Sequence, residues 1–272
     1  MASAGSSPIA VFDSGAGGLT VLRHLVERFP GESFIYAADS SHFPYGEKSL
    51  AEVREWFLMF AAFFRDAGAR ALIIACNTAT VAALDVARTQ FSLPIIGVVE
   101  AAVQRAASVT QNRRVGVLST HATYRSGLYP QALAAVNPDI EVVSKPCPAL
   151  VQMAENGQIH GISVEEEVRQ CVAPVLAQDV DTIILGCTHF PHMRQVFNRV
   201  VGDRIHIVDP GEVIADYLPP TVYARRLDRP SPRFVAWTTG NPVEFAAISR
   251  KLCPDISLTT QSLTWQNGRL TP

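Results

Sequence analysis

Lysine and charge of either sign are scarce in this chain of 272 residues. The lysines are Lys48, Lys145 and Lys251, so a mechanism that needs a catalytic lysine has few candidates. Charged residues make up 18% of the chain, below the roughly 25% that is typical of soluble domains. Lys and Arg number 23 against 25 Asp and Glu. Because no basic excess exists to neutralise a phosphate backbone, we expect no nucleic-acid partner.

Long apolar runs and disulfide patterns are also missing. The longest aromatic-rich apolar run, Trp56–Phe64, is far shorter than the roughly 20 residues of a membrane-spanning helix, so we expect no membrane association. The first residues, MASAGSSPIA, lack the charged start and apolar stretch of a secretory signal. Five cysteines are an odd and sparse set for a disulfide framework. These features predict a cytoplasmic protein with reduced thiols.

Apolar residues, by contrast, make up 48% of the chain, enough for a sizeable core, and the length predicts about two domains. Short β-branched runs alternate with helix-length segments. The runs are Ile9–Phe12, Ser33–Ala37, Ala71–Ala75, Pro94–Val98, Arg114–Leu118, Ile140–Val143, Thr182–Leu185 and Ile205–Val208. Because these runs lack polar alternation, they predict an α/β fold with mostly parallel sheets flanked by helices. In such sheets ligands bind beyond the carboxyl ends of the strands.

An internal repeat runs through the chain with a period of roughly 110 residues. Ala71–Thr78 (ALIIACNT) corresponds to Thr182–His189 (TIILGCTH), and Asp13–Ser14 corresponds to Ser119–Thr120. The alternative is chance similarity between buried strands. The repeat predicts two similar lobes related by a pseudo-twofold axis, with the active site between them.

The same repeat suggests how the chain divides. We expect residues 1–98 plus 210–272 to form the first lobe, which carries Cys76, and residues 99–209 to form the second, which carries Cys187. The stretch Leu218–Arg233 is rich in proline and arginine and has the weakest pattern. The tail after it is expected to pack back on the first lobe.

A glycine-rich loop, Asp13–Gly18 (DSGAGG), follows the first predicted strand and opens a helix. It does not match the dinucleotide fingerprint, because G-x-G-x-x-G needs a glycine where Thr20 stands. Backbone N–H groups at a helix N-terminus suit a carboxylate, and Asp13 and Ser14 can hold an ammonium group. A plain helix cap with a tight turn explains the local pattern equally well.

Cys76 and Cys187 stand at matched positions of the repeat, where a strand gives way to a helix. A helix N-terminus or a neighbouring cation activates a thiol. Two opposed thiols suit the inversion of a stereocentre, because one removes a proton from one face while the other donates a proton to the opposite face. Cys147, Cys171 and Cys253 lack repeat partners and are expected to be bystanders.

Two other interpretations remain open at this point. Cys187, His189 and His192 could be zinc ligands, although a structural zinc site needs a fourth ligand. A cysteine hydrolase could use Cys187 with His189, but this leaves Cys76 unexplained. A non-catalytic amino-acid-binding protein is a further possibility.

Several motifs together resemble a known family. They are FDSGAGGLTV (Phe12–Val21), FPYGEKS (Phe43–Ser49), ACNTAT (Ala75–Thr80), PCP (Pro146–Pro148) and GCTHFP (Gly186–Pro191). In this order and spacing, the chain resembles the glutamate racemases of the cofactor-independent amino-acid racemase family over nearly its whole length. The resemblance implies interconversion of L- and D-glutamate without pyridoxal phosphate or any other cofactor or metal, and a supply of D-glutamate for peptidoglycan synthesis. A racemase for another amino acid is the alternative.

The resemblance also implies roles for individual residues. Cys76 exchanges the proton on the D-glutamate side and Cys187 on the L-glutamate side, while Asp13, His189 and Glu155 assist as further catalytic residues. The implied substrate-binding residues are Asp13, Ser14, Pro44, Tyr45, Gly46, Asn77, Thr78, Thr188 and His189. The implied partner is the small-molecule substrate, glutamate, and a homodimer is possible.

Overall fold

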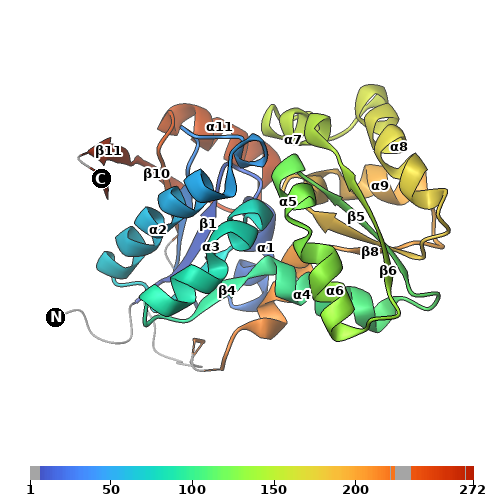
Figure 1. The fold of residues 1–272 in the computed structure, drawn as a ribbon. Coiled ribbons are helices and arrows are strands. Elements are labelled where there is room, and N and C mark those ends of the chain that lie inside the picture. Colours follow the sequence, from blue (N-terminus) through green and yellow to red (C-terminus); the bar gives the residue numbers. More distant parts are fainter. Residues whose placement is uncertain (1–6, 221, 224–233, 267) are drawn as a thin grey trace.

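Two parallel sheets lie side by side, each with helices on both faces (Figure 1). The structure is a computed structural model that describes residues 7–220, 222–223, 234–266 and 268–272. The first sheet has the strand order β10-β9-β2-β1-β3-β4 and the second has the order β6-β5-β7-β8, while β11 and β12 form a separate hairpin. Every strand pair in the two sheets is parallel.

The strands of the first sheet are β1 (Ile9–Asp13), β2 (Phe34–Ala38), β3 (Ala71–Ile74), β4 (Ile95–Gly97), β9 (Phe234–Thr238) and β10 (Thr259–Ser262). Those of the second are β5 (Arg114–Ser119), β6 (Glu141–Pro146), β7 (Thr182–Gly186) and β8 (His206–Val208). The hairpin strands are β11 (Thr264–Gln266) and β12 (Arg269–Thr271).

The helices that accompany the first sheet are α1 (Leu19–Arg28), α2 (Leu50–Asp66), α3 (Asn77–Gln90), α10 (Pro210–Ile214) and α11 (Pro242–Leu252). Those that accompany the second are α4 (Val98–Val109), α5 (His121–Ser126), α6 (Leu128–Val136), α7 (Pro148–Glu155), α8 (Ile162–Leu176) and α9 (Arg194–Val201). Three short 3₁₀ turns are η1 (Tyr45–Glu47), η2 (Phe190–Met193) and η3 (Ala215–Tyr217).

The strand orders confirm the predicted α/β fold of two similar lobes. The order β2-β1-β3-β4 in the first sheet has the same pattern as β6-β5-β7-β8 in the second. Strands β3 and β7, which precede the two cysteines of the repeat, each lie next to the strand that opens their lobe. Where the chain passes from one lobe to the other stays a prediction.

Burial on both faces explains why the strands lack polar alternation. In β1, Ile9 and Val11 belong to a buried cluster with α1, α10 and α11, whereas Ala10 and Phe12 belong to a cluster with α2 and α3. A strand covered in this way gains free energy from apolar side chains in both directions. The second sheet has two such clusters as well.

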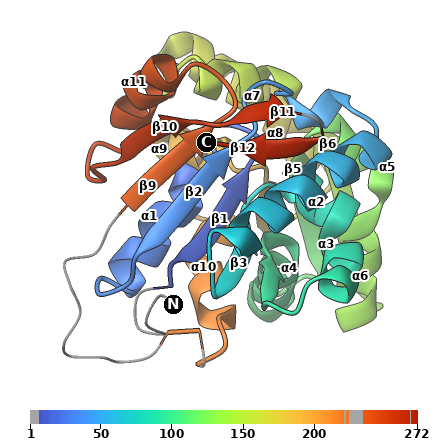
Figure 2. The same ribbon diagram turned by 90° about the vertical axis from the view of Figure 1, so that its left-hand side faces the viewer.

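The chain returns to the first sheet near its end, as Figure 2 shows for β9 beside β2. Phe34 of β2 pairs with Phe234 of β9, and β10 then extends the sheet beyond β9. Of the stretch Leu218–Arg233, residues 221 and 224–233 lie outside the described residues. No helix in the described part of the chain is long and apolar enough to cross a membrane.

A capping box ends the loop that carries the FPYGEKS motif. Ser49 accepts a hydrogen bond from the backbone N–H of Glu52, and the Glu52 carboxylate accepts one from the backbone N–H of Ser49. This reciprocal pair satisfies two of the N–H groups that a helix leaves free at its start. Because of this capping box, α2 begins directly after the turn that contains Tyr45 and Gly46. The fixed start of the helix limits the conformations that the turn can adopt.

Candidate active site

A single pocket takes residues from both lobes at the carboxyl ends of β1, β3, β5 and β7. Its empty volume, which includes the open solvent at its mouth, is about 500 Å³. The lining residues are Ser14, Phe43, Pro44, Tyr45, Gly46, Glu47, Cys76, Asn77, Thr78, Thr120, His121, Pro148, Val151, Gln152, Cys187, Thr188 and His189. Both repeat cysteines and most of the predicted substrate-binding residues therefore face one cavity.

Cys76 follows β3 and caps the N-terminus of α3. The backbone N–H of Ala79 donates to Cys76 Sγ at 3.4 Å, and the thiol donates to Ser14 Oγ at 3.7 Å. The side chain is 5% exposed. Burial, and secondarily the charge of Asp13, raises the pKa of the Cys76 thiol to about 12, so the thiol is protonated in the ligand-free protein.

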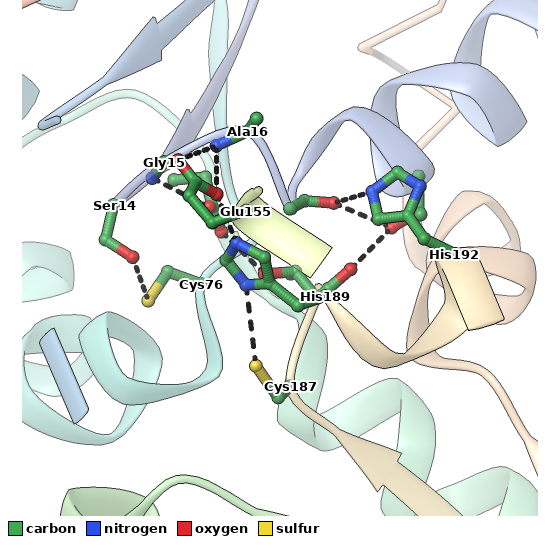
Figure 3. A network of polar contacts seen from close by, with 12 residues as sticks. Ser14, Gly15, Ala16, Cys76, Glu155, Cys187, His189 and His192 are labelled. Carbon is green, nitrogen blue, oxygen red and sulfur yellow. Dashed lines mark hydrogen bonds and ion pairs between the residues drawn. The ribbon is translucent and has the colours of Figure 1, made fainter. Parts of the chain in front are cut away.

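Cys187 follows β7 and lies beside a charged pair (Figure 3). Its Sγ is 3.7 Å from His189 Nδ1, and His189 Nε2–H donates to Glu155 Oε2 at 2.5 Å. Burial disfavours the charged form of both partners. The hydrogen bonds of His189 with Cys187 and Glu155 outweigh burial and raise the pKa of His189, while its bond to Glu155 lowers the pKa of that carboxyl. The pair is an imidazolium next to a carboxylate, with its other N–H toward the Cys187 sulfur.

The glycine-rich loop lies in close contact with the His189–Glu155 pair. A Cβ on Gly17 would lie 2.6 Å from His189 Nδ1, and a Cβ on Gly15 would lie 2.8 Å from Glu155 Oε1. A side chain at Gly17 would displace the buried His189 ring, and one at Gly15 would push the Glu155 carboxylate from its place, because the second lobe approaches the loop backbone directly. The N–H of Ala16 donates to the two Glu155 carboxylate oxygens at 3.4 and 3.3 Å. The loop thus does bind a carboxylate, and that carboxylate belongs to the chain itself.

Asp13 is fully buried and lies behind the pocket lining. It accepts hydrogen bonds from the backbone N–H of Gly15 at 3.0 Å and from Thr188 Oγ1 at 3.0 Å. Burial raises the pKa of Asp13 to about 6, although the His189 charge and these hydrogen bonds oppose the shift. Asp13 and Glu155 are not among the described lining residues. Asp13 instead holds the lining residue Thr188, and Glu155 holds the lining residue His189. Direct contact of Asp13 with a ligand therefore stays a prediction.

The rest of the described pocket wall, Glu47 and His121 apart, carries no titratable side chain beyond Tyr45 and is rich in hydroxyl groups. Thr78 Oγ1 lies 3.0 Å from Thr120 Oγ1 and 3.2 Å from Thr123 Oγ1, across the lobe boundary. Tyr45 donates to Asp39 Oδ2 at 2.6 Å, which holds the loop of Pro44 and Gly46 against the first sheet. Such groups can donate to a carboxylate without adding charge.

Sequence reasoning missed several lining residues, namely Phe43, Glu47, Thr120, His121, Pro148, Val151 and Gln152 as candidate contacts. For Thr120 a signal existed, because it is the repeat partner of Ser14. Val151 and Gln152 lie on α7, a helix that the apolar pattern did not predict. Nothing in the sequence alone placed that helix over the pocket.

The remaining candidates do not assemble at the pocket. Cys147, Cys171 and Cys253 are buried and none is a lining residue. His192 Nε2–H donates to the Gly17 carbonyl at 3.2 Å, and burial and the His189 charge lower the pKa of His192 to about 3. Nε2 of His189 and Nε2 of His192 thus have different partners, Glu155 and the Gly17 carbonyl.

Elsewhere in the described chain, His24, Asp209 and Glu212 hold ligand-type atoms within 4.8 Å of one another. Both carboxylates of this group already have partners. Asp209 caps α10 through the N–H of Gly211, and Glu212 pairs with Arg194 at 3.4 Å. This group lies outside the pocket, because none of its members is a lining residue.

Comparisons with known proteins agree with one another. The family model described as Asp/Glu/Hydantoin racemase matches residues 9–218. A glutamate racemase of Symbiobacterium thermophilum is 45% identical over 251 residues, covering 91% of each chain. One from Pseudomonas aeruginosa (strain UCBPP-PA14) is 39% identical, over 89% of this chain and 92% of the relative.

Solved structures show the same similarity in three dimensions. The glutamate racemase isoform RacE1 from Bacillus anthracis superposes with a TM-score of 0.90 at 30% identity, covering 97% of this chain and 99% of the other. The glutamate racemase from Francisella tularensis in complex with D-glutamate has a TM-score of 0.86 at 29% identity, covering 96% and 98%.

Proposed function

The chain belongs to the Asp/Glu/Hydantoin racemase family, and from this premise we propose that it interconverts L- and D-glutamate by proton transfer between two thiols. One observation supports the proposal above all. Cys76 and Cys187 come from equivalent strand ends of the two lobes and line the same pocket. An α-carbon held between them exposes one face to each thiol.

The proposed chemistry is a pair of proton transfers. In the direction from D- to L-glutamate, Cys76 first loses to solvent the proton that it carries in the ligand-free protein. Its thiolate then takes the α-proton, and the Cys187 thiol donates its own proton to the opposite face of the same carbon. In the other direction the two thiols exchange roles. Each sulfur thus ends the turnover in the protonation state in which the other began, and His189 is within reach to exchange a proton with Cys187.

The surroundings support a substrate with two carboxylates and one ammonium group, such as glutamate. Ser14, Asn77, Thr78 and Thr188 place neutral hydrogen-bonding groups on the wall of the pocket. Buried Asp13 supplies negative charge behind that wall, which favours an ammonium group nearby. No pyridoxal phosphate is needed in this scheme, and the D-glutamate formed would feed peptidoglycan synthesis. A homodimer, a cytoplasmic location and the division of the chain into lobes stay predictions.

The test is incubation of the purified protein with L-glutamate in D₂O without pyridoxal phosphate. Proton NMR follows the α-hydrogen and polarimetry follows the optical rotation. We expect the rotation to decay to zero while deuterium enters the α-position. If the rotation of aspartate or another amino acid decayed faster, that amino acid would be assigned as the substrate instead. No change with any amino acid, despite ligand binding, would favour a binding protein and contradict the proposal.

A further inference from the structure

Asn77 carries an unused hydrogen-bond donor in the pocket wall. It begins α3 immediately after Cys76, lines the pocket and is 2% exposed. Its Nδ2 is buried and has no hydrogen-bond partner. Buried amide groups in folded proteins are nearly always paired. An unpaired Nδ2 in a ligand pocket therefore points to an acceptor that the ligand supplies.

The other end of the same amide has a partner from the opposite lobe. Tyr129, on α6, donates its hydroxyl hydrogen to Asn77 Oδ1 at 2.6 Å. Tyr129 is 1% exposed, and burial raises the pKa of its hydroxyl far above the ordinary range. The hydroxyl is consequently protonated, and able to donate, near neutral pH.

This donor decides which way the amide points. The oxygen and nitrogen ends of an asparagine side chain are nearly equal in size, so packing alone hardly distinguishes them. If the amide turned over, Asn77 would present its oxygen to the pocket and repel a substrate carboxylate. The Tyr129 oxygen could then accept a hydrogen bond from the amide nitrogen, but its own O–H hydrogen would lose the acceptor that it has in the described structure. The repulsion of the carboxylate and the unpaired O–H are both unfavourable.

We propose that Tyr129 is a positioning residue for the reaction, whose hydroxyl fixes the Asn77 amide so that Nδ2 donates to a carboxylate oxygen of the substrate. The inference rests on the proposed function for the identity of that substrate. Tyr129 touches no substrate in this scheme; it acts through Asn77.

The repeat supplies independent support. Thr188 follows Cys187 as Asn77 follows Cys76, and Thr188 Oγ1 donates to Asp13 of the first lobe at 3.0 Å. Each residue that follows a repeat cysteine is therefore held by a side chain from the opposite lobe. Tyr129 holds Asn77, and Asp13 holds Thr188.

The ring of Tyr129 has a separate structural task, which determines the choice of variant. It packs in the core of the second lobe with Leu133, and its Cε2 would lie 3.2 Å from a Cβ on Gly186. Tyr129→Phe keeps this packing and removes only the hydroxyl. Tyr124→Phe, on the preceding helix at an exposed position and outside the pocket, is the matched control.

The experiment measures KM and kcat for glutamate in both directions, with melting temperature alongside. For Tyr129→Phe we expect KM to rise about fivefold to tenfold, as loss of one orienting hydrogen bond predicts, with a much smaller change in kcat. Tyr124→Phe should leave both constants unchanged. In an Asn77→Ala background the Tyr129→Phe change should add almost nothing, because the two residues act as one unit.

Two results would overturn the inference. One is an unchanged KM in Tyr129→Phe while Asn77→Ala raises it. The other is the same fold-change in KM with and without Asn77. A lower melting temperature with unchanged constants would mean that the hydroxyl only stabilises the fold. If the unmodified protein itself does not racemise glutamate, the proposed function fails instead, and the two failures are distinguishable.

Discussion

The two thiols occupy equivalent places in a duplicated fold, yet their surroundings differ in charge. Around Cys76 the hydrogen-bond partners are neutral, namely Ser14 and a backbone N–H, and the charge that acts on the thiol is the negative one of buried Asp13. Around Cys187 the partner is an imidazolium, itself paired with Glu155. The difference teaches that the repeat sets the positions of the thiols but not their electrostatics.

A physical reason for this asymmetry lies in the substrate. The pseudo-twofold axis relates the two faces of an α-carbon, but the ammonium, the carboxylate and the side chain attached to that carbon are all different. A pocket wall that obeyed the axis would offer the same groups in two places, and the substrate can use only one set. The wall residues that follow each cysteine, Asn77–Thr78 and Thr188–His189, are accordingly different.

The largest loss of activity is expected for replacement of either thiol, because the two thiols occupy equivalent positions in the two lobes. Cys76→Ser and Cys187→Ser should each lower kcat for racemisation by at least about 10³-fold, because each removes one of the two proton-transfer groups. Cys253→Ser, a buried change outside the pocket, is the control and should leave kcat unchanged. Chiral chromatography of the products measures the rate. If either active-site variant keeps its turnover, a single thiol suffices and a hydrolase-type reaction becomes the better interpretation.

A smaller effect should separate the two sides. His189→Gln should lower kcat by about 10²-fold, because Cys187 loses its cationic neighbour and Glu155 keeps a buried charge without its cationic partner. At the equivalent position Thr78→Val should cost less than about tenfold, since only hydrogen bonds between neutral groups are lost.

The two enantiomers are equal in free energy, so kcat/KM must be the same in both directions. It therefore cannot distinguish the Cys76 side from the Cys187 side. Kinetic isotope effects with α-deuterated L- and D-glutamate resolve the two proton removals. For His189→Gln the isotope effect should rise with the L-enantiomer, the side assigned to Cys187. Equal rises with both enantiomers would contradict the assigned asymmetry.

Asp13 should make the reaction pH-dependent. Its pKa is raised from 3.8 to about 6, so it loses its charge as the pH falls through that value. We expect kcat/KM to drop about tenfold between roughly pH 7 and pH 5, in proportion to the ionised fraction. Asp13→Asn should remove this acid limb and lower the plateau. A limb that persists in Asp13→Asn belongs to another group.

The stability attributable to Asp13 should change in the opposite sense. Because its folded-state pKa is raised, the folded protein holds this proton more tightly than the unfolded chain does. That contribution is complete below pH 3.8 and is lost as the pH rises through about 6. Denaturant unfolding of the Asn variant near neutral pH should show a gain of the order of 2–3 kcal/mol. A loss of stability would show that the Thr188 hydrogen bond matters more than the buried charge.

The smallest effect is expected for the charge behind His189. Glu155→Gln keeps a hydrogen-bond acceptor but removes the carboxylate that helps to raise the pKa of His189. We expect kcat near neutral pH to fall about fivefold and the basic limb of the pH–rate profile to move to lower pH. Glu166→Gln, exposed on α8, should leave the profile unchanged. If the basic limb of the Glu155→Gln profile did not move, the group that titrates in that limb would not be His189.

Much of this architecture could be predicted from the residues alone. Apolar runs without polar alternation indicated buried parallel strands, and the repeat indicated two lobes, because each strand must bury both faces wherever it lies. Short elements escaped prediction, since α5, α6, α7 and α9 carry too few residues for a clear period. Glu155, at the end of α7, was predicted only from the resemblance, because no periodicity predicted that helix.

The α/β class, the duplication and the two cysteines that follow equivalent strands could be recognised in the residues alone. These features depend on local pattern and on order along the chain, which a sequence states directly. The contacts of the DSGAGG loop with Glu155 and His189, and the hydrogen bond from Tyr129 of the other lobe to Asn77, emerged only in three dimensions. Contacts between residues far apart in the chain arise from the packing of one lobe on the other, and no local pattern encodes that geometry.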